Sequence, residues 1–367
     1  MTVASPIRQR SPAIRPATLL VAALLALFTL ATGWARASPA PAWPERLLVE
    51  LLRLEAQHPG RIGVHVRDLD TGLSASHRAD ENWYLASMIK VPVAIAVLRG
   101  VEQGAYTLET RLTVRASDYV DGAGQTNWHA VGTRLSISYL LDQMIIHSDN
   151  TASDMLIGLV GIGQVNALVQ SLVPEGLGPV TTLVDVRRHA YSQLAQAAMQ
   201  LQGQDFLSLR QQRTDADRLE VFSRLVGTPV WRLRMPTLDD AYDAYYATGL
   251  NSGRLDAYGR LLALLAEGKA LGPASTAYLL DTLERVETGK RRIKAGLPAS
   301  VRFAHKTGTQ RARVCDAGVI TVAGAGRRIV VVACTRGEPS IARSERALAA
   351  VGEAISRSGL LSVETTP

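Results

Sequence analysis

The stretch Leu85-Ala86-Ser87-Met88-Ile89-Lys90 places a hydroxyl and an amine three residues apart at the predicted start of a helix. On a helix, positions i and i+3 share a face, so we expect Lys90 to reach the Ser87 oxygen. Residues 91–98 are almost all apolar, which indicates that this helix is buried. Burial favours a neutral amine, which is able to take a proton from a serine hydroxyl.

The composition draws attention to this amine. Only five of the 40 basic residues are lysines, at positions 90, 269, 290, 294 and 306. Because arginine does not give up its proton, a lysine in such a chain indicates a need for a titratable group. A surface helix that happens to carry both residues is the alternative interpretation of Ser-x-x-Lys alone.

The N-terminus has the pattern of a secretory signal peptide, with an apolar run over 17–34 and a small-residue site that predicts cleavage after Ala37. Cleavage would make the protein secreted or periplasmic, without stable membrane insertion; the alternative is an uncleaved anchor. Losing the four arginines of 1–37 lowers the net charge from +7 to +3. With no basic block interleaved with aromatics, nucleic acid is excluded as a partner.

The order of predicted elements indicates an α+β fold. A helix over 44–58 precedes strands over 61–67 and 73–77, and strands return after Pro298, before a last helix over 341–358. We expect an antiparallel sheet of about five strands built from both termini and flanked by helices, with a large inserted all-α subdomain. The expected catalytic domain is 38–367, with the sheet from 38–80 and 299–367, the helical part from 81–298, and an extended insert near 189–246.

The only two cysteines, Cys315 and Cys334, flank a glycine-rich turn between two strand-like runs. A turn centred between residues 324 and 325 makes the two cysteines face each other across the strands. We expect a cross-strand disulfide, which export would permit; two free thiols are the alternative.

Two further clusters follow the first motif. Ser148-Asp149-Asn150 lies between two predicted helices, and Lys306-Thr307-Gly308-Thr309 ends a predicted strand. The ordered trio Ser-x-x-Lys, Ser-Asp-Asn and Lys-Thr-Gly resembles the serine β-lactamases and penicillin-binding proteins, most closely the class A β-lactamases, over roughly residues 43–360. A helix cap and a strand end are the structural alternatives for the two later clusters.

The resemblance implies a role for each motif residue. Ser87 would attack an amide carbonyl and form an acyl-enzyme, Lys90 would take its proton, and Ser148, polarised by Lys306, would protonate the leaving nitrogen. The backbone N–H groups of Ser87 and Thr309 would form the oxyanion hole. Further substrate contacts are expected from Asn150, Thr307, Gly308 and Thr309, with Arg311 or Arg313 helping to hold a carboxylate.

The sequence departs from that family in the residue that activates water. Class A β-lactamases carry a Glu-x-x-x-Asn element after the Ser-Asp-Asn helix, and this chain has none; an end-to-end count places Arg187 near the glutamate position. Asp185, the nearest carboxylate, is expected either to act as the deacylation base or to pair with Arg187 or Arg188.

These features predict a class A-like β-lactamase, monomeric, with no cofactor and no metal-ligand spacing. The alternatives are a penicillin-binding D-Ala-D-Ala peptidase or slow-deacylating β-lactam binder, with a β-lactam or peptidoglycan peptide as substrate, and a periplasmic scaffold without chemistry.

Overall fold

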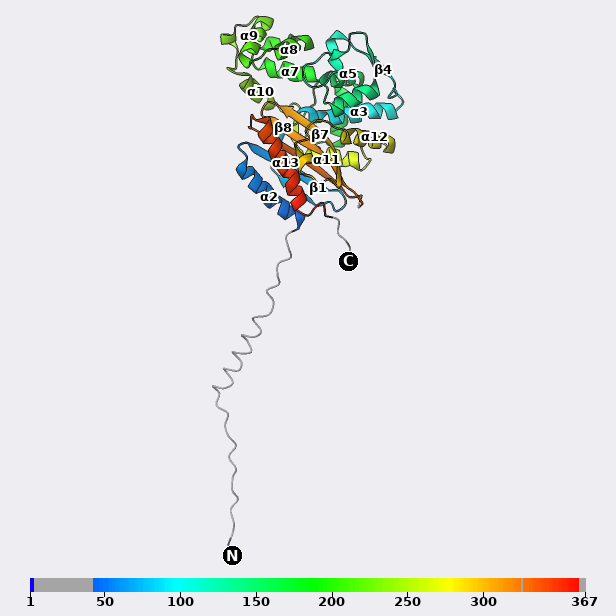
Figure 1. Ribbon diagram of the computed structural model, residues 1–367, viewed down its shortest axis with the longest axis vertical. Coiled ribbons are helices and arrows are strands. Elements are labelled where there is room, and N and C mark those ends of the chain that lie inside the picture. The colour runs from blue at the N-terminus through cyan, green and yellow to red at the C-terminus, as the bar shows by residue number, and fades with distance from the viewer. Residues whose placement is uncertain (3–41, 325, 363–367) are drawn as a thin grey trace. The chain divides into compact units, whose positions relative to one another are not determined.

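The computed structural model of the protein (Figure 1) describes residues 1–2, 42–324 and 326–362. Apart from residues 1–2, the predicted signal peptide lies outside the described residues.

A five-stranded antiparallel sheet lies in the lower half of the coloured ribbon that begins at α2 in Figure 1. Its strands are β1 (Arg61–Asp68), β2 (Ser74–His77), β7 (Val301–Gln310), β8 (Arg313–Val322) and β9 (Arg328–Arg336). They lie in the order β2-β1-β9-β8-β7, so the early strands pair with the late ones and the sheet is built from both ends, as predicted. β7 is an edge strand, which leaves one of its sides for contact with the helical part.

Helices cover both faces of this sheet. α2 (Trp43–Gln57) and α13 (Ile341–Arg357) pack on one face, where Leu47, Leu51 and Val351 are fully buried. α11 (Leu255–Ala266) packs on the other face and joins the sheet to the larger core of the helical part. The leucines of α2 recur at helical spacing after a proline in the first turn, so the sequence pattern accounts for this helix.

The predicted helical part contains nine more α-helices among the described residues. They are α3 (Lys90–Glu102), α4 (Ile137–Ile146), α5 (Asn150–Val160), α6 (Ile162–Leu172), α7 (Leu183–Ser192), α8 (Gly203–Arg210), α9 (Asp215–Val226), α10 (Leu238–Tyr246) and α12 (Pro273–Glu284). The expectation that this part is all-α is wrong. Two small antiparallel sheets lie within it, β3 (Asn82–Tyr84) with β6 (Ser252–Arg254), and β4 (Arg111–Thr113) with β5 (Arg134–Ser136). Three-residue strands are too short to show an alternating pattern.

The predicted insert near 189–246 contains α8 and α9, which lie beside α7 at the top of Figure 1. It has a hydrophobic cluster of its own, in which Tyr191 packs against both Phe206 and Phe222. The extra length of the chain therefore forms a packed layer rather than a long loop.

The predicted disulfide is present. Cys315 on β8 lies directly opposite Cys334 on β9, with a Cα–Cα distance of 4.1 Å, and the two sulfurs are bonded. The symmetric placement of the cysteines about the turn was enough to predict this register.

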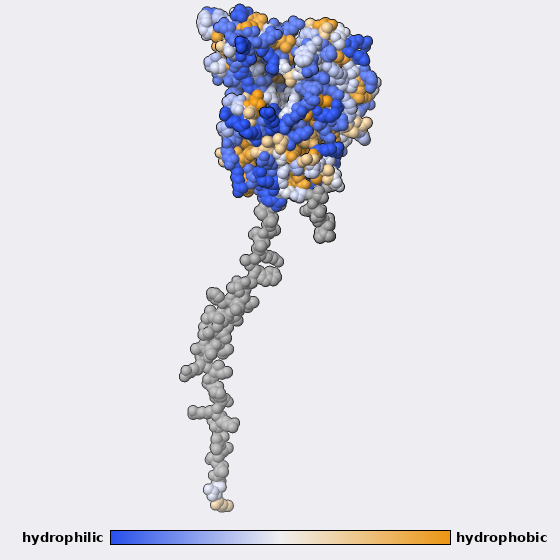
Figure 2. Space-filling model, in the orientation of Figure 1, coloured by the Kyte–Doolittle hydropathy of each residue, from blue (hydrophilic) through white to orange (hydrophobic). Residues whose placement is uncertain are grey.

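Hydrophilic residues predominate on the described face shown in Figure 2, and apolar residues form only small separate groups there. None of the described helices is by itself long and apolar enough to cross a membrane. Only α5 and α6 taken together, which meet at 85°, are as long and apolar as a membrane-spanning segment.

Candidate active site

Ser87 lies where the helical part meets the edge of the sheet. It sits on a 3-10 turn, η1 (Ala86–Ile89), and not on the α-helix itself, which begins at Lys90. The backbone enters this turn with a φ of +48° at Ala86, a strained value for a residue with a side chain. A Cβ added to Gly308 of β7 would lie 2.4 Å from the Leu85 carbonyl oxygen, so only glycine allows this approach. The turn therefore brings Ser87 close to the end of β7.

Lys90 is fully buried beneath this turn. Its Nζ donates to the Ser148 carbonyl oxygen at 2.6 Å and to Asn150 Oδ1 at 2.8 Å, and Ser148 Oγ lies 3.3 Å away. Burial lowers the pKa of Lys90 to about 7, and the charge of Arg187 acts in the same direction. The predicted hydrogen bond between Lys90 and Ser87 is not seen. Lys90 bonds to Ser148 and Asn150 instead, and Ser87 Oγ has no hydrogen bond within the described chain. A carbonyl and an amide oxygen are the acceptors that the Ser148 turn presents to the amine.

Ser148-Asp149-Asn150 forms the turn between α4 and α5. Asp149 is the N-cap of α5, since its Oδ1 accepts from Ala152 N at 2.8 Å and its Oδ2 from Thr126 N at 2.7 Å. The capping role proposed as an alternative is therefore real, and the same cap fixes the catalytic candidates. Ser148 itself has a φ of +61°, a conformation that turns the chain sharply at this point.

Lys306 approaches the same hydroxyl from β7. Its Nζ donates to Ser148 Oγ at 3.0 Å and to the Thr307 carbonyl oxygen at 3.2 Å. Burial, and then the neighbouring charge of Lys90, hold the pKa of Lys306 well below its usual range. Two amines from distant parts of the chain thus converge on Ser148 Oγ, which is the arrangement that a proton relay requires.

Arg292 is a site residue that the sequence analysis missed. It is buried, and it donates from Nη2 to Thr309 Oγ1 at 2.7 Å and from Nη1 to the Gly308 and Cys315 carbonyl oxygens at 3.0 and 2.8 Å. A guanidinium beside the Thr309 hydroxyl is suited to a substrate carboxylate. Its position within the run Lys290-Arg291-Arg292 gave no signal, because such runs are typically solvated.

Arg311 and Arg313, the predicted carboxylate clamp, are engaged elsewhere. Arg311 forms ion pairs with Asp215 at 2.6 Å and Asp239 at 2.7 Å, and Arg313 pairs with Asp243 at 2.9 Å. The reversal after Gln310 turns both side chains toward α9 and α10, which supply these carboxylates. The structure therefore gives the place beside Thr309 to Arg292.

The segment that should activate water contains an ion pair instead. Arg187 Nε donates to Asp121 Oδ1 at 2.6 Å, with both side chains largely buried. Asp185 pairs with Arg188 at 3.0 Å, as the structural alternative predicted, and its own N–H donates to the Thr182 hydroxyl that caps α7. Arginine thus holds both Asp185 of this segment and Asp121, which reaches the segment from the loop between η2 (Ala116–Asp118) and η3 (Thr126–Trp128).

Asp154, also missed from the sequence, anchors this segment to the Ser148 cluster. It lies one turn after Asn150 on α5 and accepts from the backbone N–H groups of Leu183 and Val184 at 2.6 and 2.9 Å. Burial raises the pKa of Asp154 to about 7. The start of α7 is therefore fixed by the helix that carries Asn150.

Among the described residues there is no group of three or more His, Cys, Asp or Glu side chains placed to hold a metal ion.

Comparison with known proteins agrees with the family resemblance that the three motifs indicate. Residues 46–358 match the model of the β-lactamase enzyme family. The chain belongs to this family. It is 26% identical to β-lactamase CTX-M-8 of Citrobacter amalonaticus over 309 residues, which is 83% of this chain and 87% of that protein. A β-lactamase of Rhodobacter capsulatus is 36% identical over 132 residues, and this match spans 36% of the chain and 45% of the relative.

Solved structures share the fold. A variant of the class A β-lactamase of the last common ancestor of Gram-negative bacteria has a TM-score of 0.65 and 26% identity, covering 86% of this chain and all of that one. PBP-A has a TM-score of 0.64 and 22% identity, covering 85% and 95%. The α+β fold and the resemblance to class A enzymes are thus confirmed, and the chain is a β-lactamase-like serine hydrolase.

Proposed function

We propose that the protein cleaves β-lactam amides through an acyl-enzyme on Ser87 and that its turnover is limited by deacylation. Support for the first step comes from the convergence on Ser148 Oγ of two buried amines, Lys90 and Lys306. The position of Arg187 supports the second part.

Acylation would begin with transfer of the Ser87 proton to neutral Lys90. Lys90 donates to the Ser148 carbonyl and to Asn150 Oδ1, so a neutral amine has one position left to take up a proton, on the side where the Ser148 hydroxyl lies 3.3 Å away. Ser87 Oγ would then attack the carbonyl carbon, forming the ester C–O bond while the amide C–N bond breaks. The departing nitrogen would take a proton from Ser148 Oγ, which Lys90 resupplies, with Lys306 holding that hydroxyl in place.

Two groups of donors would orient the substrate. The approach of η1 to Gly308 supports an oxyanion hole made by the backbone N–H groups of Ser87 and Thr309. The hydroxyls of Thr307 and Thr309 would donate to the substrate carboxylate. Lys306 and Arg292, which lie beside them, would supply the positive charge.

Deacylation needs a base for the attacking water, and this is where the chain departs from its relatives. The Asp121 carboxylate accepts from Arg187, and Asp185 accepts from Arg188. An arginine does not act as a general base at neutral pH. We therefore expect the ester to be hydrolysed much more slowly than it forms.

A long-lived ester would also suit a penicillin-binding enzyme that acts on D-Ala-D-Ala peptides, and this is the second candidate function. The observation that favours it is the same Arg187–Asp121 pair. A scaffold without chemistry is disfavoured, because nothing in packing requires two lysines to be buried around one serine hydroxyl.

We further propose that the protein is secreted after cleavage behind Ala37 and acts as a monomer without a cofactor. The Cys315–Cys334 disulfide supports an oxidising compartment. N-terminal sequencing of the protein recovered from the periplasm would find Ser38 first if this is right, and Met1 if it is wrong.

Labelling with a fluorescent penicillin tests the acylation step. We expect a stable covalent adduct on the native protein, none on Ser87→Ala, and full labelling of Ser74→Ala, which removes an exposed hydroxyl on β2. Labelling of Ser87→Ala at the native rate would contradict the proposal.

A further inference from the structure

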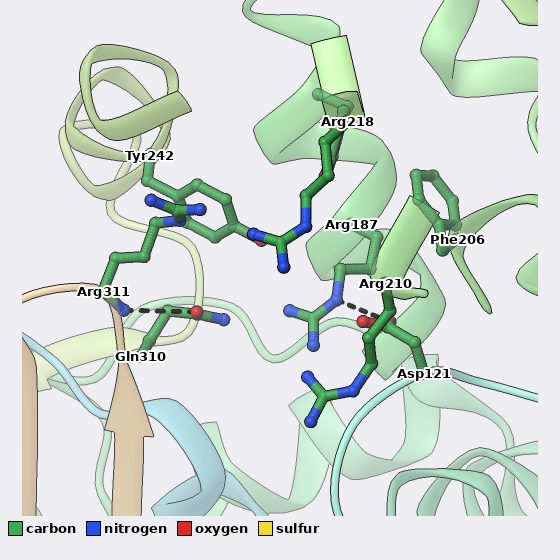
Figure 3. A pocket seen from close by; sticks show the side chains of 9 residues that line it. Asp121, Arg187, Phe206, Arg210, Arg218, Tyr242, Gln310 and Arg311 are labelled. Carbon is green, nitrogen blue, oxygen red and sulfur yellow. Dashed lines mark hydrogen bonds and ion pairs between the residues drawn. The ribbon is translucent and has the colours of Figure 1, made fainter. Parts of the chain in front are cut away.

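A hollow of about 120 Å³ lies beside the proposed active site and is lined by four arginines (Figure 3). The guanidinium groups of these arginines point toward the same space, with the rings of Tyr242 and Phe206 at its edges. The lining arginines are Arg187, Arg210, Arg218 and Arg311.

The hollow adjoins the catalytic cluster on two sides. Gln310, one of its lining residues, directly follows Thr309 on β7. On the other side, the backbone carbonyl of Asp121 accepts from Asn150 Nδ2 at 2.7 Å, and Asn150 Oδ1 accepts from Lys90. Asn150 is the residue expected to contact the acyl side chain of a substrate, so this side chain would point toward the hollow.

The insert supplies one side of the hollow. Arg210 ends α8 and Arg218 lies on α9, while α7 contributes Arg187. Without α8 and α9, the space beside Arg187 would be open to solvent on that side. The added helices therefore turn the neighbourhood of Arg187 into a cationic enclosure.

The positive charges in the hollow are only partly balanced. Arg187 pairs with Asp121, whereas Arg218 and Arg311 share one carboxylate, that of Asp215. Arg311 also reaches the exposed Asp239, and within the described chain Arg210 has no ion-pair partner. Guanidinium groups gathered around one space repel each other, and an anion placed between them removes that repulsion.

We propose that this hollow binds a carboxylate carried by the acyl side chain of the substrate. The inference rests on the proposed acylation of Ser87 and names the class of acyl group that the enzyme prefers. A carboxylate fits because guanidinium groups bind it through paired, charge-assisted hydrogen bonds.

Carbenicillin and benzylpenicillin provide a matched pair of probes, because they differ only by a carboxylate on the acyl side chain. We expect the native protein to be acylated faster by carbenicillin, and Arg210→Gln to reduce this preference about tenfold. Arg213→Gln is the control, since it removes an equal charge from an exposed residue of the same insert that does not line the hollow. An equal ratio of the two rates in all three proteins would overturn the inference.

A second measurement separates this inference from the proposed function, because it needs no reaction. Phenylacetamide and the monoamide of phenylmalonate, which keep the acyl carbon as an amide as in the two drugs, are titrated into the native protein and followed by NMR. Tighter binding of the phenylmalonate monoamide that Arg210→Gln abolishes and Arg213→Gln retains would support the carboxylate site in the hollow, even if neither drug acylated Ser87. Equal binding of both probes, with Ser87 acylated normally, would overturn the site while leaving the proposed function intact.

Discussion

Two neighbouring regions of this molecule, the surroundings of Ser148 and the start of α7, differ in what they offer to a reaction. Around Ser148, two buried lysines converge on one hydroxyl from α3 and β7. At the start of α7, the carboxylates of Asp121 and Asp185 are each bound by an arginine. The first region has what the proposed acylation requires. In the second, arginines bind Asp121 and Asp185, and Asp154 accepts from two backbone N–H groups, so each of these carboxylates is engaged.

The groups proposed for acylation and those near the expected site of deacylation therefore lie on separate elements. The groups proposed for acylation are fixed by the contact of η1 with β7 and by the Asp149 cap, whereas the α7 segment is tied to them through Asp154 and through the Arg187–Asp121 pair. One half of the reaction is therefore able to change while the other stays intact.

The largest expected effect is on the acylating half. We expect Lys90→Met to slow acylation by about a thousandfold, because it removes the base while keeping an unbranched side chain in the buried space. The measurement is the rate of adduct formation with benzylpenicillin. Lys269→Met, at an exposed lysine, serves as the control and should react like the native protein. A loss below threefold would remove Lys90 from the mechanism.

The pH dependence of the acylation rate tests the proposed role of Lys90 as the base. Because only neutral Lys90 accepts a proton and burial lowers its pKa to about 7, acylation should rise about tenfold per pH unit below 7 and level off above it. The folded protein also binds fewer protons at Lys90 than the unfolded chain between about pH 7 and 10, so this group makes stability rise with pH over that window. Stopped-flow acylation from pH 5 to 9 checks the rate; a flat profile would contradict a neutral Lys90.

A smaller effect is expected at Arg292, which lies beside Thr309 at the site proposed for the substrate carboxylate. Arg292→Lys keeps the charge but does not reproduce the fork that contacts Thr309, Gly308 and Cys315, so we expect about a tenfold lower second-order acylation rate. Arg291→Lys, at the exposed neighbour, should have no effect on this rate. Equal rates for both variants would show that Arg292 only supports the strand.

The smallest effect is expected in the deacylating half. Asp185→Asn should change the rate of adduct loss by less than about twofold, because Asp185 is paired with Arg188 and is not free to act as a base. Adduct decay followed by mass is the measurement. A tenfold slower decay in this variant would identify Asp185 as the base and contradict the claim that its pairing with Arg188 prevents this role.

The sequence predicted features that are local or symmetric. The three motifs are short and ordered, the sheet strands are long enough to show their pattern, and the spacing of Cys315 and Cys334 determines their register. The Ser148 cluster followed because the resemblance supplied the contacts between distant motifs.

What the sequence did not predict depends on contacts between residues far apart in the chain. Arg292 and Asp121 carry no local pattern, and their partners lie 17 and 66 positions away. Arg311 was placed wrongly for the same reason, since only the folded insert brings Asp215 to it. The family pattern therefore located the proposed nucleophile but not the arginines that lie around the site.

Intact-protein mass spectrometry of residues 38–367 mixed with benzylpenicillin, sampled from seconds to hours alongside the absorbance of the drug, decides whether an ester forms on Ser87 and whether it is lost slowly. We predict that an adduct forms on Ser87 within seconds and persists for many minutes while most of the drug in excess survives. A transient adduct with rapid consumption of the drug over many turnovers would contradict the account, because an efficient base for water would then have to exist beside the Arg187–Asp121 pair.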